Sequence, residues 1–282
     1  MLQQGRMRHC MDFEKMRRHP PVAEIAYRTN AINEYGLDAM YLLAGTEKAL
    51  LIDTGTGVFD LPGLIAARTE LPLMVALTHG HPDHAGGMGW FDRVYANPAD
   101  FGMALGASYE NRRDFARSLD RNPASPVTNA DTVVFEKQPE MLPLQEGDVI
   151  DLGGRQVVVY ETPGHSPGGL SFLDVRERIL FVGDACNGNT LMLPFGGTIG
   201  PRQTVSALLE TCRKIQRLEP YFDRNYNGHI GFGGTAYGAA AEFTLNEAVL
   251  PIAEEMTTLT AWRSFDPYME FGDFNSSSPN SI

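Results

Sequence analysis

The chain has little cysteine, no long hydrophobic run and no excess of basic charge. Its 282 residues include three cysteines, Cys10, Cys186 and Cys212, which show no CxxC spacing and cannot form a complete set of disulfides. We therefore expect ordinary packed thiols in a reducing, cytoplasmic compartment. No segment approaches the roughly 18 apolar residues of a membrane helix. The N-terminus has no apolar stretch that would serve as a signal peptide, so no membrane partner is expected.

The charge balance is acidic. Lysine and arginine number 23 against 35 aspartates and glutamates, for a formal net charge of −12. Nucleic-acid binding normally needs a basic patch that neutralises phosphates, so we expect no nucleic-acid partner. A hydrophobic fraction of 43%, with 10% aromatics, supplies material for a large core. A homo-oligomer is compatible with this composition, but no feature identifies one.

Short apolar runs and helical stripes alternate in two similar halves, which predicts one α/β domain over residues 21–264. The strands are predicted within 22–53 and over 73–78, 155–161, 169–173 and 179–182, and the helices over 60–70, 205–215 and 245–259. The pattern does not decide whether the sheets are parallel, antiparallel or mixed.

Three polar segments accompany this domain. Residues 1–20 are expected to form a poorly ordered arm, and residues 265–282 a tail rich in Ser, Asn, Asp and Pro. A helical insertion is predicted over about 99–140, where it could cover the mouth of an active site. Arg112 and Arg113 lie on it; an exposed helix face is the commoner explanation, and attraction of an anionic substrate is the alternative.

The strongest local signal is the sequence HGHPDH, directly after an apolar strand. Histidine nitrogen and carboxylate oxygen are the ligands of zinc-type sites. His79 and His81 could share one metal ion while Asp83 and His84 turn toward a second. A solvated histidine cluster in a turn is the alternative.

Three further polar residues follow predicted strands in glycine-rich loops: His165 in TPGHSPGG, Asp184 in LFVGDA and His229 in NYNGHIG. Taken singly, a lone histidine is more often structural, and an aspartate after glycine often caps a turn. Outside these loops and HGHPDH the chain has only His9 and His19, both in the N-terminal arm and assigned no role. The shared setting therefore favours one combined metal site.

The order HxHxDH, then His165, Asp184 and His229, resembles the metallo-β-lactamase superfamily, including its glyoxalase II and lactonase members. The resemblance extends from about Tyr41 to Gly231 and includes ALLIDTG and TPGHSPGG. It implies an α/β fold of four layers, an αββα sandwich with the metals at one edge, between the two sheets.

The resemblance also implies two metal sites that share one ligand. The first would comprise His79, His81 and His165. The second would comprise Asp83, His84 and His229, with Asp184 bridging both. Asp53, in LIDTG, resembles an acid that orients a ligand loop. A turn-forming aspartate is the alternative for this residue, and it need not exclude that role.

The expected function is hydrolysis of a small-molecule substrate. Two divalent ions, zinc first and iron or manganese as alternatives, would hold a bridging hydroxide that attacks a thioester, ester or lactone carbonyl. Asp83 and Asp184 are the candidate catalytic residues. An aspartate at position 184 argues against a dedicated β-lactamase, and His81 against a flavodiiron protein. Phosphodiester cleavage and di-iron redox chemistry are the remaining alternatives.

Residues near the proposed bridging acid are candidates for substrate contact. Met192–Phe195 could line an apolar pocket or form a buried loop. Asn187 and Tyr226 could donate hydrogen bonds to an oxyanion or leaving group, although structural hydrogen bonding is the favoured role for both. Cys186 is best explained as an inert packed thiol.

Overall fold

The computed structural model describes residues 20–121, 125–185 and 201–229. Predictions for several other segments lie outside these ranges. They concern the arm up to residue 19, Cys186, Asn187, Met192–Phe195, the helix over 245–259 and the tail over 265–282.

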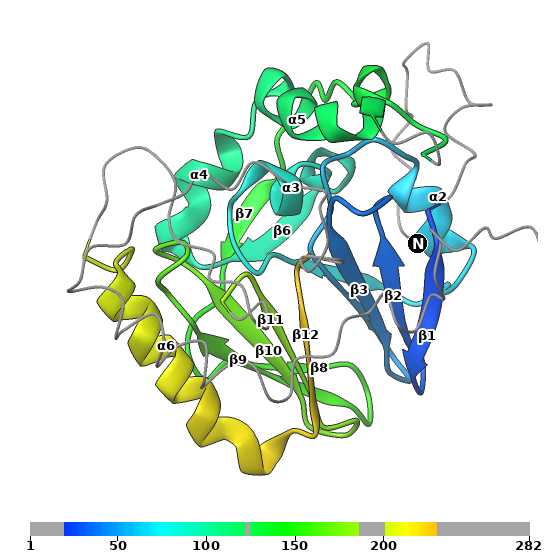
Figure 1. Ribbon diagram of the computed structural model, residues 1–282. Helices are drawn as coiled ribbons and strands as arrows, with labels where there is room; N and C mark the ends of the chain where they lie inside the picture. Colours follow the sequence, from blue (N-terminus) through cyan, green and yellow to red (C-terminus); the bar gives the residue numbers. More distant parts are fainter. Residues whose placement is uncertain (1–19, 122–124, 186–200, 230–282) are drawn as a thin grey trace, which may run out of the picture.

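Two mixed β-sheets form the centre of the described part (Figure 1). The larger has seven strands in chain order: β1 Val22–Ala26, β2 Thr29–Asn33, β3 Ala39–Ala44, β4 Ala49–Ile52, β5 Leu73–Ala76, β6 Arg93–Ala96 and β7 Glu140–Pro143. Strands β1 to β4 pair antiparallel, whereas β4 to β7 pair parallel.

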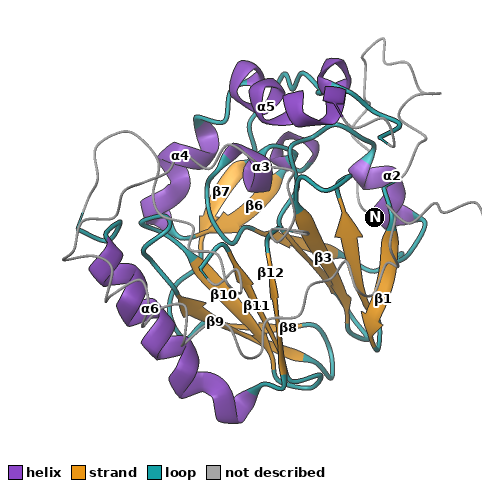
Figure 2. Ribbon diagram, viewed as in Figure 1, coloured by secondary structure: helices purple, strands orange, loops and turns teal. Residues whose placement is uncertain are grey.

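The smaller sheet has five strands in the order β12-β11-β10-β9-β8. Its strands are β8 Val149–Asp151, β9 Gln156–Glu161, β10 Leu170–Asp174, β11 Ile179–Gly183 and β12 Arg224–Asn227. All its pairs are antiparallel except β11 with β12, which is parallel. The two sheets lie face to face (Figure 2).

Alternate residues of the central strands enter different hydrophobic clusters. In β3, Met40 contacts the cluster on the outer face of the larger sheet, and Tyr41 the cluster between the sheets. In β11, Phe181 lies between the sheets, while Leu180 and Val182 face outward. Side chains alternate across a strand, so strands that are apolar at every position must be covered on both faces.

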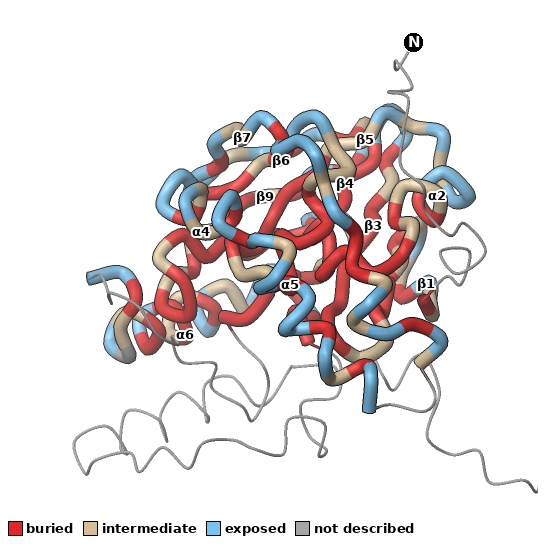
Figure 3. Tube along the Cα trace, turned by 90° about the horizontal axis from the view of Figure 1, so that it is seen from above, coloured by how far each residue is buried: buried red, intermediate tan, exposed pale blue. Residues whose placement is uncertain are grey.

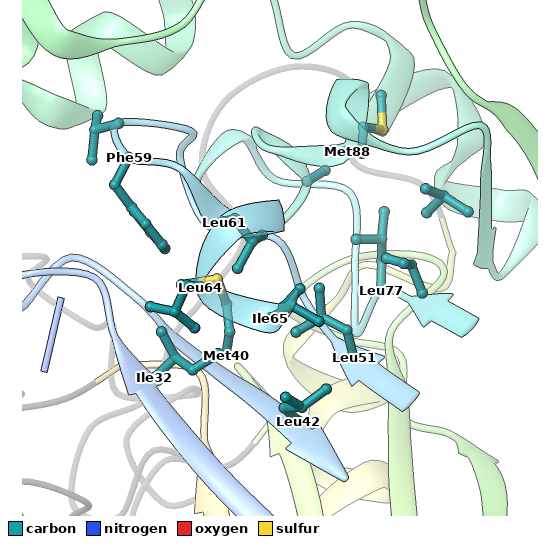
Figure 4. Close-up of a cluster of buried hydrophobic side chains, with 14 of the residues drawn as sticks. Ile32, Met40, Leu42, Leu51, Phe59, Leu61, Leu64, Ile65, Leu77 and Met88 are labelled. Atoms are coloured by element: carbon teal, nitrogen blue, oxygen red, sulfur yellow. The ribbon is translucent and has the colours of Figure 1, made fainter. Parts of the chain in front are cut away.

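Helices provide that outer cover. Helix α2 (Leu61–Ala66) packs Leu64 and Ile65 onto the larger sheet, next to Met40 and Leu51 (Figure 4). Helix α6 (Val205–Leu218) lies along the smaller sheet (Figure 1), where Ile215 joins the cluster of Leu180 and Val182. The order helix, sheet, sheet, helix confirms the predicted αββα sandwich. No helix in the described ranges is long and apolar enough to cross a membrane.

The helix predicted over 60–70 is shorter than expected. It begins where predicted, because the side chain of Asp60 accepts a hydrogen bond from the Gly63 amide at 2.9 Å. It ends at Ala66, where the amides of Arg68 and Thr69 both bond to the carbonyl of Ile65 and close a turn.

The polar segment after β6 is a series of short helices. They are η2 Pro98–Asp100, α4 Phe101–Leu105, α5 Tyr109–Phe115, η3 Ala116–Arg121 and η4 Asn129–Asp131; two further single turns, η1 Met88–Trp90 and η5 Glu219–Tyr221, lie elsewhere. The chain leaves the helical path after α4, and Ser108 starts α5 by accepting a hydrogen bond from the Asn111 amide at 3.2 Å. Figure 3 shows more exposed residues on α4 and α5 than on the sheet strands beneath them.

Candidate metal centre

Four loops bring the seven predicted ligands together at one edge of the two sheets. The loop after β5 carries His79 and His81 and continues into the short helix α3 (Pro82–Ala85), which contains Asp83; His84 follows on the same helix. The other three ligands follow β9, β11 and β12: His165, Asp184 and His229. Six of the seven are buried, and His81 is partly buried.

Hydrogen bonds between the sheets fix this edge. The Tyr41 hydroxyl in β3 donates to the Asn227 carbonyl in β12 at 2.6 Å. The Ala39 amide donates to the Gly228 carbonyl at 2.8 Å. The Leu170 amide in β10 donates to the Thr78 carbonyl, directly before His79, at 2.7 Å. The segments that carry His79 and His229 are therefore each bonded to the opposite sheet.

The three-histidine group consists of His79, His81 and His165. The Nδ1 atom of His81 lies 3.0 Å from Nε2 of His79 and 2.9 Å from Nε2 of His165. Burial, together with the neighbouring imidazoles, lowers the pKa of His79 well below its usual value and that of His81 to about 4. Both rings are therefore neutral at pH 7 and offer nitrogen lone pairs to a cation.

The mixed group consists of Asp83, His84 and His229. The Nε2 atoms of the two histidines are 3.3 Å apart, and Asp83 Oδ2 lies 3.7 Å from His84 and 3.5 Å from His229. Burial opposes a charge on His229, but Asp184 and Asp83 outweigh it and raise its pKa to about 9. This half of the centre thus concentrates negative charge, which a bound cation would balance.

Asp184 lies between the two groups. Its Oδ2 atom is 3.2 Å from His165 Nε2 and 3.0 Å from His229 Nε2, and its Oδ1 atom is 3.5 Å from His84 Nε2. Burial disfavours its charge, yet His229, His84 and His165 hold its pKa well below the usual value. Asp184 is therefore ionised and placed to contact ions in both groups.

Asp53 makes the loop contacts expected of an orienting acid. It accepts hydrogen bonds from the Thr78 amide and hydroxyl, both at 2.7 Å. Since that hydroxyl donates to Asp53, it accepts from His79 Nδ1 at 3.0 Å, and Asp53 itself accepts from His84 Nδ1 at 3.0 Å. Both histidines then direct Nε2 inward. Asp53 adopts a φ of 63°, a left-handed conformation that aspartate tolerates better than most residues.

The chemistry of these side chains fits divalent cations. His229 Nδ1 donates to the Leu37 carbonyl at 2.8 Å, so its Nε2 is the atom directed at the other ligands. The Oδ1 atom of Asp83 is buried and makes no hydrogen bond. In both groups the candidate ligand atoms lie within 4.8 Å of one another. Buried lone pairs that converge in this way are costly unless protons or a cation join them.

Two buried aspartates near the centre were not anticipated. Asp38 Oδ1 lies 3.3 Å from His84 Nδ1, the same nitrogen that contacts Asp53. Neither of its oxygens makes a hydrogen bond, and burial raises its pKa well above the usual value. Asp100 contacts two ligand loops. In sequence, GLDAM and NPADF resemble ordinary turn and helix-start patterns, so neither aspartate carries a distinctive signal.

The exposed helix face and the anion-attracting role suggested for Arg112 are both wrong. Its guanidinium is buried and donates to the carbonyls of Thr56 and Val133 at 3.2 and 2.7 Å, beside the Phe135 ring. The charge faces inward because these carbonyls satisfy it. Tyr226 packs in the core between the sheets, which matches its favoured structural role.

Comparisons with known proteins agree with the fold described above. The family model described as the metallo-beta-lactamase superfamily matches residues 38–222, a range that holds every predicted ligand except His229. The acyl-coenzyme A thioesterase MBLAC2 of Bos taurus is 34% identical over 194 residues, 64% of this chain and 67% of that protein.

Two further matches come from bacteria. The hydroxyacylglutathione hydrolase GloC of Haemophilus influenzae is 27% identical over 175 residues, 59% of this chain and 73% of that protein. Among solved structures, a metallo-beta-lactamase family protein of Thermus thermophilus is 25% identical with a TM-score of 0.51, covering 74% of this chain and 72% of that one.

Proposed function

The chain belongs to the metallo-beta-lactamase superfamily and is a hydrolase of that family, and we propose that it cleaves acyl thioesters at a pair of divalent metal ions. One observation carries the proposal. Asp184 joins a group of three histidines to a second group that contains a carboxylate. Such an arrangement is suited to two cations that share one ligand.

Similarity favours thioesters over the other acyl substrates. The bovine relative, whose name states that it acts on acyl-coenzyme A, is 34% identical over 67% of its length. The relative from Haemophilus influenzae acts, by its name, on hydroxyacylglutathione. The shared chemistry of these two substrates is an acyl group on the sulfur of a large thiol. We propose an acyl thioester of such a thiol as the substrate class.

The proposed ligand sets are His79, His81 and His165 for one ion, and Asp83, His84 and His229 for the other, with Asp184 on both. We propose zinc, since nitrogen and carboxylate donors suit it. When bound, the two cations supply Lewis acidity, which makes a water molecule acidic near neutral pH and polarises the carbonyl of the thioester.

The chain's own residues hold the ligands and accept the proton. The Leu37 carbonyl fixes the His229 ring through Nδ1, and Asp53 fixes the His84 ring directly and the His79 ring through the Thr78 hydroxyl. Asp83 has one oxygen directed at the two histidines of the mixed group and a second, Oδ1, that is buried without a hydrogen bond. We propose that Oδ1 takes the proton released by the attacking water.

The experiment is a metal count and a substrate panel on the same sample. The full chain is purified without chelators, its metals are measured by elemental analysis, and acyl-coenzyme A, an acylglutathione, a lactone, an oxygen ester and a phosphodiester are assayed. Asp174→Asn serves as a control, because Asp174 is a buried carboxylate that pairs with Arg155 and is not among the candidate ligands.

We expect about two zinc ions per chain and thioester cleavage that is lost with a chelator and restored by zinc. The Asp174→Asn variant should keep both ions. Preference for the phosphodiester would reject the thioester proposal, and two redox-active irons with little hydrolysis would favour the di-iron alternative. A chain that binds no metal after reconstitution would overturn the metal centre itself.

A further inference from the structure

Asp100 is a buried carboxylate that is not among the seven predicted ligands. It is the last residue of η2, at the start of the polar helical segment, and it is fully buried. Its side chain lies between the loop that carries His79 and His81 and the loop that carries His165. Both loops belong to the three-histidine group.

Three hydrogen bonds connect Asp100 to these loops. Its Oδ2 accepts from the Gly80 amide at 3.0 Å and from the Ser166 hydroxyl at 2.7 Å. Its Oδ1 accepts from the Gly168 amide at 2.6 Å. Gly80 lies between the two histidines of the first loop, and Ser166 directly follows His165. Two of the three donors are therefore direct sequence neighbours of ligands.

The packing around Asp100 is tight enough to make these contacts specific. A methyl group on Gly80 would lie 2.8 Å from the Asp100 carbonyl oxygen, and one on Gly168 would lie 2.7 Å from the Asp100 carboxyl carbon. Both are closer than a real Cβ contact, so the two loops approach Asp100 only because these positions are glycine.

The mixed group is held by other residues. His84 is fixed by Asp53 and lies beside Asp38, and His229 is fixed by the Leu37 carbonyl. All three of these contacts come from the N-terminal strands and the turns beside them. Among the described residues, the hydrogen bonds of the Asp100 side chain go to the two loops of the three-histidine group.

We propose that Asp100 is the positioning residue of the three-histidine group, holding the His79–His81 loop and the His165 loop so that their nitrogens converge on one ion. This inference rests on the proposed metal centre. A carboxylate suits the position because it can accept from several donors at once and carries no proton donor of its own. Through Asp100, the polar helical segment would support the binding of this ion.

The test is a site-specific metal count on the full chain. Asp100→Asn keeps the shape of the side chain but turns a donor toward the loops. We expect one ion per chain in place of two, with affinity for the lost ion reduced about 10- to 100-fold, as for other residues that support ligands. Adding His165→Ala should remove no further ion, whereas adding His229→Ala should remove the remaining one.

A milder variant serves as a control for misfolding. Ser166→Ala removes one hydrogen bond to Asp100 and leaves the carboxylate in place, so we expect a folded protein with weaker binding of the same ion in a chelator competition. Asp174→Asn, another buried carboxylate, should bind two ions at the wild-type affinity.

Four outcomes would overturn the inference. Asp100→Asn and Ser166→Ala could bind both ions as tightly as the wild type, which would leave the proposed function standing. The two variants could weaken the binding of both ions equally, which would mean a general loss of stability. Loss of the same ion from Asp174→Asn would mean the same. A wild-type chain that binds no metal would overturn the proposed function, and this inference with it.

Discussion

The two halves of the candidate metal centre differ in charge and in the parts of the fold that hold them. The three-histidine group has nitrogen donors alone, and burial keeps His79 and His81 neutral. The mixed group contains Asp83, lies beside Asp53 and Asp38, and holds His229 at a raised pKa. The loops of the first group meet at Asp100, whereas the second is held by residues at the N-terminal strands, of which Asp53 also reaches His79 through Thr78.

This difference has an electrostatic consequence. A cation in the mixed group would have Asp83 as well as Asp184 as a ligand, whereas a cation among the three histidines would have Asp184 as its carboxylate ligand and would feel Asp83 from farther away. Coulomb attraction is strongest between opposite charges that are close together and buried. We therefore expect the mixed group to keep its ion more tightly, and the three-histidine group to be more sensitive to loss of supporting contacts.

The largest effect should follow loss of the shared ligand. Asp184→Asn removes the carboxylate charge that lies against histidines of both groups. We expect turnover to fall by more than the roughly 100-fold typical of residues that merely support ligands, with weaker binding of both ions. Turnover and metal content are measured on the same preparation. Full activity with two bound ions would show that the halves do not depend on Asp184.

The next comparison removes one ligand from each group in turn. His165→Ala should leave one ion in the mixed group, and His229→Ala one ion among the three histidines. Because Asp83 belongs to the mixed group alone, the ion left by His165→Ala should resist a chelator longer. The readout is the metal content over a chelator titration. Equal resistance in the two variants would contradict the charge argument.

A smaller difference is expected between the two aspartates beside His84. Asp53→Asn disturbs His84 directly and His79 through Thr78, so we expect weaker binding of both ions by about 10- to 100-fold. Asp38→Asn should affect the mixed group alone and less strongly, since Asp38 lies 3.3 Å from His84 and makes no hydrogen bond. Competition with a chromogenic chelator measures both. If Asp38→Asn weakens the binding of both ions equally, the assignment of Asp38 to the mixed group is wrong.

The sequence was most informative where chemistry and local order coincide. HGHPDH follows a buried strand, and three more polar residues follow strands in glycine-rich loops, so candidate ligands could be predicted one strand at a time. The alternation of Met40 and Leu42 with Tyr41 and Leu43 likewise matches strands covered on both faces. The family resemblance, now confirmed, added the order of layers.

The residues whose roles could not be predicted from the sequence contact residues that are far away along the chain. Asp100 bonds to Ser166, 66 positions away, and Asp38 lies beside His84 of a different loop, so both pairings arise only when the chain has folded. Strand β2, TNAIN, lies within the range predicted for strands but has no clear pattern of its own, because Thr29 and Asn33 are buried rather than exposed to water. Arg112 was misjudged for the same reason: carbonyls from two distant loops satisfy its charge inside the protein.

The last prediction concerns the metal-stripped protein, in which the halves should respond to pH in opposite directions. The pKa of His81 is lowered from 6.5 to about 4, so the folded state binds fewer protons than the unfolded chain between these values. Its contribution is complete above pH 6.5 and is lost as the pH falls toward 4, at most on the order of 3 kcal/mol. The pKa of His229 is raised to about 9, so its contribution is complete below pH 6.5 and is lost as the pH rises through 9.

Urea denaturation of the stripped protein across this range should therefore show greatest stability near pH 6.5. His81→Gln should flatten the acid side of the curve and leave the alkaline side, and His229→Gln should do the reverse. Zinc should remove the alkaline slope, because a bound cation keeps His229 unprotonated, and it should steepen the acid slope, because the unfolded chain then takes up protons that the zinc-bound ligands do not. If each substitution flattened both sides of the curve alike, the histidines of the two groups would titrate as one coupled unit. The groups would then differ in carboxylate charge but not in the pKa values of their histidines.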